Sequence, residues 1–270
     1  MNTQDNQPNW HQIAEKFDIW LPQLAPVGEA LLTALAAQAG ERVLDLASGT
    51  GEPALTLAQR LSNQVNLSGV DAADGMVQVA RTKAAKLGLS NITFETMPAE
   101  QLRFDDNSFD RALCRFGVML FQDPLKGLTE MRRVLKPRGR FALAVWNTPE
   151  TMPTLHWAYK VFAPRLPADQ HPPLAKITSL GGPGVLEDLL RRAGFTDLSV
   201  ETRVLHYQFA SFKDYWDTVE ASDVLKVQFD ALRADERRLI RNEVEQFAQA
   251  FVGPEGLRIP HEYRLASGIK

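Results

Sequence analysis

The sequence predicts an α/β protein with a mostly parallel sheet that helices cover on both faces. Three observations predict this fold class. Strand-like apolar runs alternate with helical patterns through residues 40–147. The first of these runs, VLDLA at 43–47, breaks into a glycine turn and re-forms at once as a helical pattern. The alternation resumes after an interruption rich in proline, with a helix at 185–195. Because parallel strands need crossover connections, this rhythm indicates one sheet of βαβ units.

The individual elements follow from apolar spacing and from the residues that end each run. Strands are expected at 43–47, 66–72, 92–97, about 111–116, 140–147, around 198–209 and 261–269. Helices are expected between them at 53–61, 75–87, 125–136 and 185–195. Pro53 suits the first turn of its helix, Gly88 ends the second helix and Pro137 stops the third. Upstream, residues 10–39 read as two helices joined by a turn that contains Pro22 and Pro26.

The chain divides into four expected segments. Residues 1–39 form an N-terminal helical lid, and residues 40–147 form a ligand-binding core. Residues 148–182 are an insertion on the substrate side, and residues 183–270 complete the core around a helical cap at 211–252. Since open α/β sheets bind ligands beyond the carboxyl ends of their strands, the cap is expected to roof the site.

Composition excludes several classes of function. The 270 residues carry 30 basic and 33 acidic side chains without a basic cluster, so nucleic-acid binding is not expected. Cys114 is the single cysteine, and no His, Cys and carboxylate cluster has metal-ligand spacing, so neither disulfides nor a metal site are expected. The first ten residues do not resemble a signal peptide, and no apolar run is long enough to span a membrane. These features predict a cytoplasmic protein, whose oligomeric state stays open.

The glycine turn in VLDLASGTGEPALTL indicates a bound nucleoside. Glycines that follow a strand and precede a helix let backbone approach a ligand closely, although a merely structural turn also needs glycine. Asp71 ends the second strand, 20 residues after Gly51. An acid at that place can accept hydrogen bonds from ribose hydroxyls.

Asp45, within the first strand, argues against a phosphate at the same turn. A neighbouring carboxylate repels a pyrophosphate, whereas it attracts an ammonium group. S-adenosylmethionine combines adenosine with an amino-acid tail and fits both acids. A nicotinamide-dependent oxidoreductase is disfavoured by Asp45 and by the absence of the third glycine of GxGxxG, since Glu52, Pro53 and Ala54 follow Gly51. A non-catalytic cofactor-binding protein with a regulatory or partner role remains an alternative.

A family resemblance rests on five motifs in order along the chain: LDLASGTGEPAL, GVDAADGM, MPAEQLRFDDNSFD, LCRFGVMLF and VLKPRGRFAL. They resemble class I S-adenosylmethionine-dependent methyltransferases, most closely the small-molecule (type 11) branch with the ubiquinone and menaquinone methyltransferases. The resemblance is specific over 40–147, and weaker over 183–210 and 261–269. It implies a Rossmann-like seven-stranded sheet of order 3-2-1-4-5-7-6 with the last strand antiparallel. It also implies methyl transfer from S-adenosylmethionine to O, N, C or S of a small molecule, leaving S-adenosylhomocysteine.

The resemblance also assigns cofactor-binding positions in this chain. Asp45, Ala47, Gly49 and Gly51 would line the methionine moiety, Asp71 would hold the ribose, and Arg115 would lie between cofactor and substrate. The full predicted set is Trp20, Asp45, Ala47, Ser48, Gly49, Gly51, Asp71, Ala72, Met76, Pro98, Ala99, Glu100, Arg115, Phe116 and Gly117. Ala47 replaces the first glycine of the common DxGxGxG pattern, and its methyl group is tolerable if its φ is negative.

No catalytic motif is obligatory for displacement at a sulfonium, because alignment and water exclusion supply most of the effect. A general base is needed only if the acceptor must lose a proton. His156 and His11 are the weak candidates for this role, while His206 and His261 are expected to be structural. Trp20 or Phe17 could close over the cofactor, although core packing is the commoner role for such residues.

Overall fold

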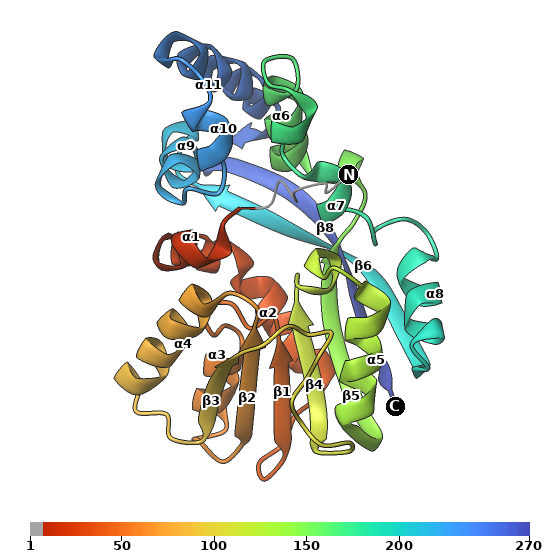
Figure 1. Cartoon of the computed structure of the whole chain (residues 1–270). Coiled ribbons are helices and arrows are strands. Elements are labelled where there is room, and N and C mark those ends of the chain that lie inside the picture. Colours follow the sequence, from red (N-terminus) through yellow and green to blue (C-terminus); the bar gives the residue numbers. More distant parts are fainter. Residues whose placement is uncertain (1–7) are drawn as a thin grey trace.

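The computed structural model describes residues 8–270 and confirms the predicted fold class (Figure 1). The strands run in the order β3-β2-β1-β4-β5-β8-β6, and a two-residue strand, β7, pairs with β8. β8 is antiparallel to both β5 and β6, so it is the expected last strand of the order 3-2-1-4-5-7-6. The strand bounds are β1 Arg42–Leu46, β2 Asn66–Asp71, β3 Ile92–Thr96, β4 Phe109–Arg115, β5 Leu135–Trp146, β6 Thr196–Phe209, β7 Val252–Gly253 and β8 Gly256–Ile269.

Helices cover both faces of this sheet. In the view of Figure 1, α5 and α8 lie in front of the strands, while α2 and α3 lie behind them. The bounds of the core helices are α3 Ala54–Arg60, α4 Asp74–Lys86, α5 Pro124–Val134 and α8 Val185–Arg192. Within residues 8–270, no helix combines the length and the apolarity that crossing a bilayer demands.

The N-terminal segment differs from the expected two helices with a proline turn. Helix α1 is Trp10–Phe17, a 3-10 turn follows at Asp18–Trp20, and α2 runs Leu21–Leu35. The break therefore precedes both prolines. Pro22 lies in the first turn of α2, where its missing N–H would have no helical partner, and Pro26 is accommodated inside the helix. Residues 1–7 of the expected lid lie outside the described part of the chain.

The boundary between α5 and β5 also differs from the expectation. The helix ends at Val134, and β5 begins at Leu135 because Leu135 pairs with Phe109 of β4. The register shifts before Arg111 pairs with Arg140, so Pro137 lies at an irregularity of the ladder, where a strand tolerates proline. Long-range pairing thus overrides the local helical pattern of residues 135–136.

Strands β6 and β8 continue past the end of β5 as a two-stranded ribbon. The last pair between β5 and β8 is Trp146 with Tyr263, whereas β6 and β8 stay paired as far as Phe209 with Leu257. We call residues 204–209 and 257–262 the ribbon extension. Figure 1 shows it rising from the sheet into the cap. We use the word cap from here on for both segments above the sheet. The expected insertion at 148–182 contributes α6 Pro153–Phe162 and α7 Leu174–Ile177, and the expected cap at 211–252 contributes α9 Phe212–Ala221, α10 Lys226–Asp230 and α11 Ala234–Ala248.

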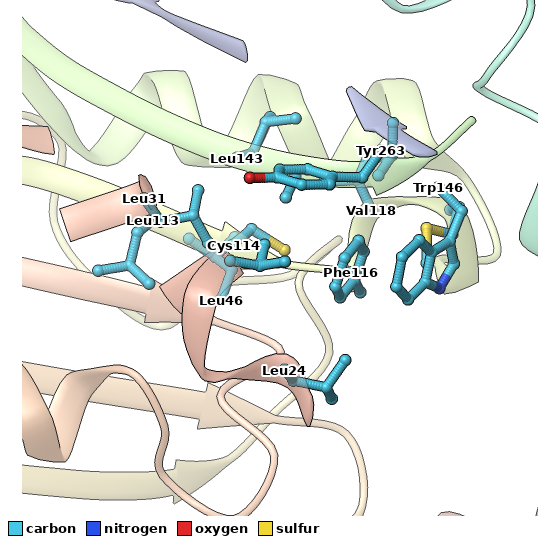
Figure 2. Close-up of a cluster of buried hydrophobic side chains, with 14 of the residues drawn as sticks. Leu24, Leu31, Leu46, Leu113, Cys114, Phe116, Val118, Leu143, Trp146 and Tyr263 are labelled. Carbon is cyan, nitrogen blue, oxygen red and sulfur yellow. The ribbon is translucent and has the colours of Figure 1, made fainter. Parts of the chain in front are cut away.

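A cluster of buried side chains lies beneath the ends of β1, β4 and β5 (Figure 2). Leu46, Leu113 and Leu143 contribute from the three strands and are fully buried. Burial raises the pKa of the Cys114 thiol to about 12, so this cysteine is an inert core side chain. The ring of Phe116 stacks on that of Trp146 with centroids 3.8 Å apart. The core thus reaches the edge of the sheet, where the ligand site is expected.

Candidate active site

A cavity of about 1010 Å³ lies between the carboxyl ends of β1 to β5 and the cap. Its sheet side is formed by the segments that follow these strands, and its roof includes residues of α6, α9 and the ribbon extension. The 3-10 turn at Asp18–Trp20 and the start of α2 close a further side through Trp20 and Leu24. This is where an open α/β sheet binds its ligands.

The predicted cofactor positions gather at this cavity. All of them except Asp45 and Gly51 line it, and those two lie just behind the wall in β1 and the glycine turn. The lining members are Trp20, Ala47, Ser48, Gly49, Asp71, Ala72, Met76, Pro98, Ala99, Glu100, Arg115, Phe116 and Gly117. Their individual roles stay predictions.

The glycine turn is held in place by Asp71. Its carboxylate accepts hydrogen bonds from the backbone N–H groups of Gly49 and Ala73, each at 2.9 Å. Burial nevertheless raises the pKa of Asp71 above its usual value. Because a carboxylate offers about four lone-pair positions, Asp71 can accept further hydrogen bonds from a ligand. Gly51 has φ +101°, a backbone conformation that favours glycine, and a Cβ there would lie 2.7 Å from Leu55 Cδ1 in helix α3. Both observations favour glycine at position 51.

Asp45 is the most unusual charged group of the site. It is 1% exposed, and within residues 8–270 neither of its carboxylate oxygens has a hydrogen-bond partner. Burial raises the pKa of Asp45 well above its usual value, an effect that the nearby Arg115 only partly opposes. Buried polar groups are almost always satisfied, so a bare carboxylate indicates a cationic group supplied by a ligand.

Arg115 is the opposite charge beside Asp45. It lines the cavity at the end of β4, and within the described residues its guanidinium makes no hydrogen bond or ion pair. Burial lowers the pKa of Arg115, and the charge of Asp45 acts against this lowering. Among the described residues, one anion and one cation without partners therefore border the same turn. Together they complement a ligand that carries both an ammonium group and a carboxylate.

The backbone of Ala47 contradicts the expectation of a negative φ. Its φ is +52°, and that of Phe116 on the facing segment is +59°. A left-handed conformation costs a non-glycine residue about 1–2 kcal/mol. Gly117 accommodates the methyl group, since a Cβ on Gly117 would lie only 2.4 Å from the Cβ of Ala47. Strain of this kind collects at functional sites, where the surrounding structure maintains it.

Replacing Ala47 with glycine is expected to stabilise the protein by about 0.5–1 kcal/mol, because the strain it removes exceeds the added chain entropy. Thermal unfolding measures this gain as a higher Tm. Ala30, inside α2, is a matched control, since glycine in a helix interior is expected to lower the stability by about 1 kcal/mol. A loss of stability in the Ala47→Gly variant would show that the left-handed turn is not strained.

The N-terminal segment is fastened over the glycine turn by charged contacts. Asp18 accepts hydrogen bonds from the hydroxyl of Thr50 and, at 3.0 Å, from Lys83 Nζ. Lys16 pairs with Asp223 of the cap. Trp20 is buried and lies 5.6 Å from the ring of Tyr207, so it borders the cavity from this segment. Phe17 also lines the cavity, which leaves both aromatic residues as candidates for closing over a cofactor.

Neither histidine proposed as a base reaches the cavity. His11 does not line it, and its Nδ1 accepts a hydrogen bond from the backbone N–H of Gly75 at 2.9 Å. His156 lies on α6, whose cavity side is formed by Thr154, Leu155 and Ala158. Helical spacing places His156 on the side of α6 away from these positions, and within residues 8–270 its buried Nδ1 has no hydrogen-bond partner. The catalytic hypothesis for both residues is therefore not supported by their positions.

Several cavity residues carried no sequence signal for function. Tyr207 belongs to the ribbon extension and lines the roof, as do Tyr215 of α9 and Thr154 of α6. Tyr215 belongs both to the buried core of the cap and to the cavity wall. Strand alternation could have placed Tyr207 and Phe209 on one face, but the sequence does not show that this face is turned toward a ligand.

Glu100 connects two of the segments that border the cavity. Its carboxylate accepts hydrogen bonds from the backbone N–H groups of Gln122 at 2.8 Å and Asp123 at 3.3 Å. The turn after β3 is thereby tied to the start of α5. No group of three or more potential metal ligands occurs within residues 8–270.

Comparison with known proteins agrees with this geometry. The ubiE/COQ5 methyltransferase family model matches residues 29–170. The chain is 40% identical over 122 residues to a ubiquinone/menaquinone biosynthesis C-methyltransferase of Geobacter sp. (strain M21), covering 45% of this chain and 52% of the relative. It therefore spans about half the length of the curated relatives it matches.

Solved structures share the fold over nearly the whole chain. The YcgJ protein of Bacillus subtilis superposes with a TM-score of 0.62 at 23% identity, over 92% of this chain and 98% of that protein. A phosphoethanolamine N-methyltransferase 2 of Haemonchus contortus, in complex with S-adenosyl-L-methionine, has a TM-score of 0.62 at 18% identity, over 95% of this chain and 56% of that protein. The family match covers more than half of the chain, from α2 through the sheet core into the cap. The resemblance seen in the sequence motifs is confirmed: the chain belongs to the ubiE/COQ5 methyltransferase family.

Proposed function

We propose that this protein transfers a methyl group from S-adenosylmethionine to a small, largely apolar acceptor. The observation that carries the proposal is that Asp45 and Arg115, neither of which has a hydrogen-bond or ion-pair partner within residues 8–270, lie beside a glycine turn held by the carboxylate of Asp71. An amino-acid tail and a ribose are the two groups that this arrangement complements.

The residues present fit the cofactor as follows. Asp45 would hold the ammonium group of the methionine moiety, and Arg115 would hold its carboxylate. Asp71 would accept hydrogen bonds from the ribose, while Ala72 and Met76 would pack near the adenosine and Ala99 near the adenine. S-adenosylmethionine would supply a methyl group bonded to a sulfonium, and the neutral thioether of S-adenosylhomocysteine would be the leaving group.

The protein then contributes alignment and exclusion of water. Positioning two reactants can lower a barrier by about 7–11 kcal/mol. Trp20, Phe116 and Trp146 surround the cavity with buried aromatic rings, which favour a planar acceptor. Neither His11 nor His156 lines the cavity, so a proton that the acceptor loses as the new bond forms would pass to water rather than to either histidine.

The names of the curated relatives suggest the acceptor class. Several are C-methyltransferases of ubiquinone and menaquinone biosynthesis, so an aromatic ring methylated at carbon is the acceptor we propose. The nearly neutral chain, with a net charge of −3, favours a small molecule over nucleic acid. A cytoplasmic location is part of this proposal.

Calorimetric titration with S-adenosylhomocysteine and with NADH tests the cofactor. We expect binding of S-adenosylhomocysteine and no binding of NADH, because Asp45 would repel a pyrophosphate at the turn. Tight binding of NADH with no response to S-adenosylhomocysteine would reject the proposal. Binding of S-adenosylhomocysteine without methyl transfer to any phenolic or quinol acceptor would favour the non-catalytic alternative.

A further inference from the structure

Two tyrosines in the roof of the cavity have hydroxyls that lack a partner among the described residues. Tyr207 and Tyr215 line the cavity and are 7% and 4% exposed. Within residues 8–270, neither hydroxyl makes a hydrogen bond, and neither is among the polar atoms that are sealed from solvent without a partner. Buried tyrosines usually hydrogen-bond their hydroxyls, so these two are free to bind a ligand.

Both rings are held in place by aromatic neighbours. Tyr207 lies between Trp20, at 5.6 Å, and His261, at 4.2 Å between ring centroids. His261 is itself fixed, because Thr154 Oγ1 and the carbonyl of Ile259 bind its two ring nitrogens at 2.7 and 3.1 Å. A neutral His261 would donate from Nδ1 to that carbonyl and accept at Nε2 from Thr154. His261 therefore packs behind Tyr207 and supports its ring.

Tyr215 is fixed in the same way. Its ring contacts those of Phe209 at 5.4 Å and Trp157 at 6.3 Å. Burial raises the pKa of both tyrosines. Both hydroxyls consequently keep their protons at neutral pH. Two protonated donors on rings held in place thus line the same cavity, which Arg115 also lines.

We propose that Tyr207 and Tyr215 are specificity-determining residues that together bind an oxygen of the methyl acceptor through hydrogen bonds from their hydroxyls. An acceptor with a ring hydroxyl or carbonyl satisfies both donors, whereas a pure hydrocarbon leaves them unpaired in an apolar roof. A site that hydrogen-bonds an oxygen discriminates strongly against the analogue that lacks it. This inference rests on the proposed function, and it adds the group that orients the acceptor.

The test uses the full chain saturated with S-adenosylhomocysteine and two probes, 1-naphthol and 1-methylnaphthalene. The wild-type protein is expected to bind 1-naphthol more tightly. Tyr207→Phe and Tyr215→Phe should each weaken binding of 1-naphthol about 5- to 10-fold and leave 1-methylnaphthalene unaffected, because each removes one hydrogen bond. Tyr159→Phe is the matched control, since Tyr159 is exposed on α6 outside the cavity.

The outcomes separate this inference from the proposed function. Failure of the wild-type protein to bind S-adenosylhomocysteine would reject the function itself. Normal binding of S-adenosylhomocysteine by both variants, with unchanged affinity for 1-naphthol, would overturn the tyrosine pair and leave the function standing. Equal loss of both probes would also overturn it, because a packing defect affects a hydrocarbon as much as a phenol. A wild-type protein that binds neither probe, or both equally, would contradict it too.

Discussion

The Asp45→Asn variant is expected to bind S-adenosylhomocysteine about 100-fold more weakly than the wild type and yet to be more stable without ligand. The carboxylate has no hydrogen-bond partner in residues 8–270, and the proposed ammonium group of the ligand would be its partner. Losing a charge-assisted hydrogen bond of this kind costs about 1.5–3 kcal/mol. Isothermal titration gives the affinity, and urea unfolding gives the stability.

The gain in stability has a defined dependence on pH. The pKa of Asp45 is raised in the folded protein above its ordinary value of 3.8, chiefly by burial. The folded state therefore binds the proton more tightly than the unfolded state. The contribution of Asp45 is most favourable below 3.8 and is lost as the pH rises through the raised pKa. Asparagine cannot ionise, so its advantage over the wild type should grow over this range.

Asp110 provides a control of opposite sign. Its pKa is lowered, because the backbone N–H of Arg42 and the side chain of Lys136 stabilise its charged form against the effect of burial. Its contribution is present above the ordinary pKa and lost in acid, so Asp110→Asn should be less stable than the wild type at neutral pH. An Asp45→Asn protein that binds S-adenosylhomocysteine normally would contradict the proposed ammonium contact.

Replacing Asp71 with alanine is expected to reduce affinity for S-adenosylhomocysteine by about 1–3 kcal/mol, or roughly 5- to 150-fold. The substitution removes the proposed acceptor for the ribose, and it also leaves the N–H groups of Gly49 and Ala73 without their carboxylate. Unlike Asp45→Asn, this variant should therefore lose stability as well as affinity.

A ligand pair separates the two effects of Asp71. The wild type should bind S-adenosylhomocysteine more tightly than its 2′,3′-dideoxy analogue, whereas Asp71→Ala should not distinguish the two. Such a cycle isolates the contact between Asp71 and the ribose from the general disturbance of the turn. If the variant still prefers the ribose hydroxyls by the wild-type factor, the ribose lies elsewhere.

The sequence predicted the sheet well because its signals are local and repeated. Except for β3, which a loop connects to β4, each parallel strand of the core is followed by a helical segment, and the glycine turn between β1 and α3 marks the ligand edge. The motifs that resemble the methyltransferase family supplied the order of the strands. Positions near the turn, such as Gly49 and Asp71, came from the same short-range pattern.

Features that depend on distant pairing were not predictable in this way. The early start of β5 at Leu135 follows from Phe109 on another strand, and the positive φ of Ala47 follows from the space left by Gly117. The roof residues Tyr207 and Tyr215 belong to segments whose relation to the sheet only the tertiary structure defines. His156 shows the opposite kind of error. Its position after β5 suggested a place in the active site, but helix α6 directs other residues to the cavity.

The ribbon extension gives the depth of the cavity a simple physical origin. The paired backbones of β6 and β8 run without interruption from the sheet to Phe209 and Leu257, so the height of the roof above the glycine turn depends on how many residue pairs they contain. Each antiparallel pair adds about 3.4 Å. Insertion or deletion of two residues in both strands would move the roof by about 7 Å and preserve the inward face of every side chain. A change in strand length can thus admit acceptors of another size while leaving the cofactor end untouched.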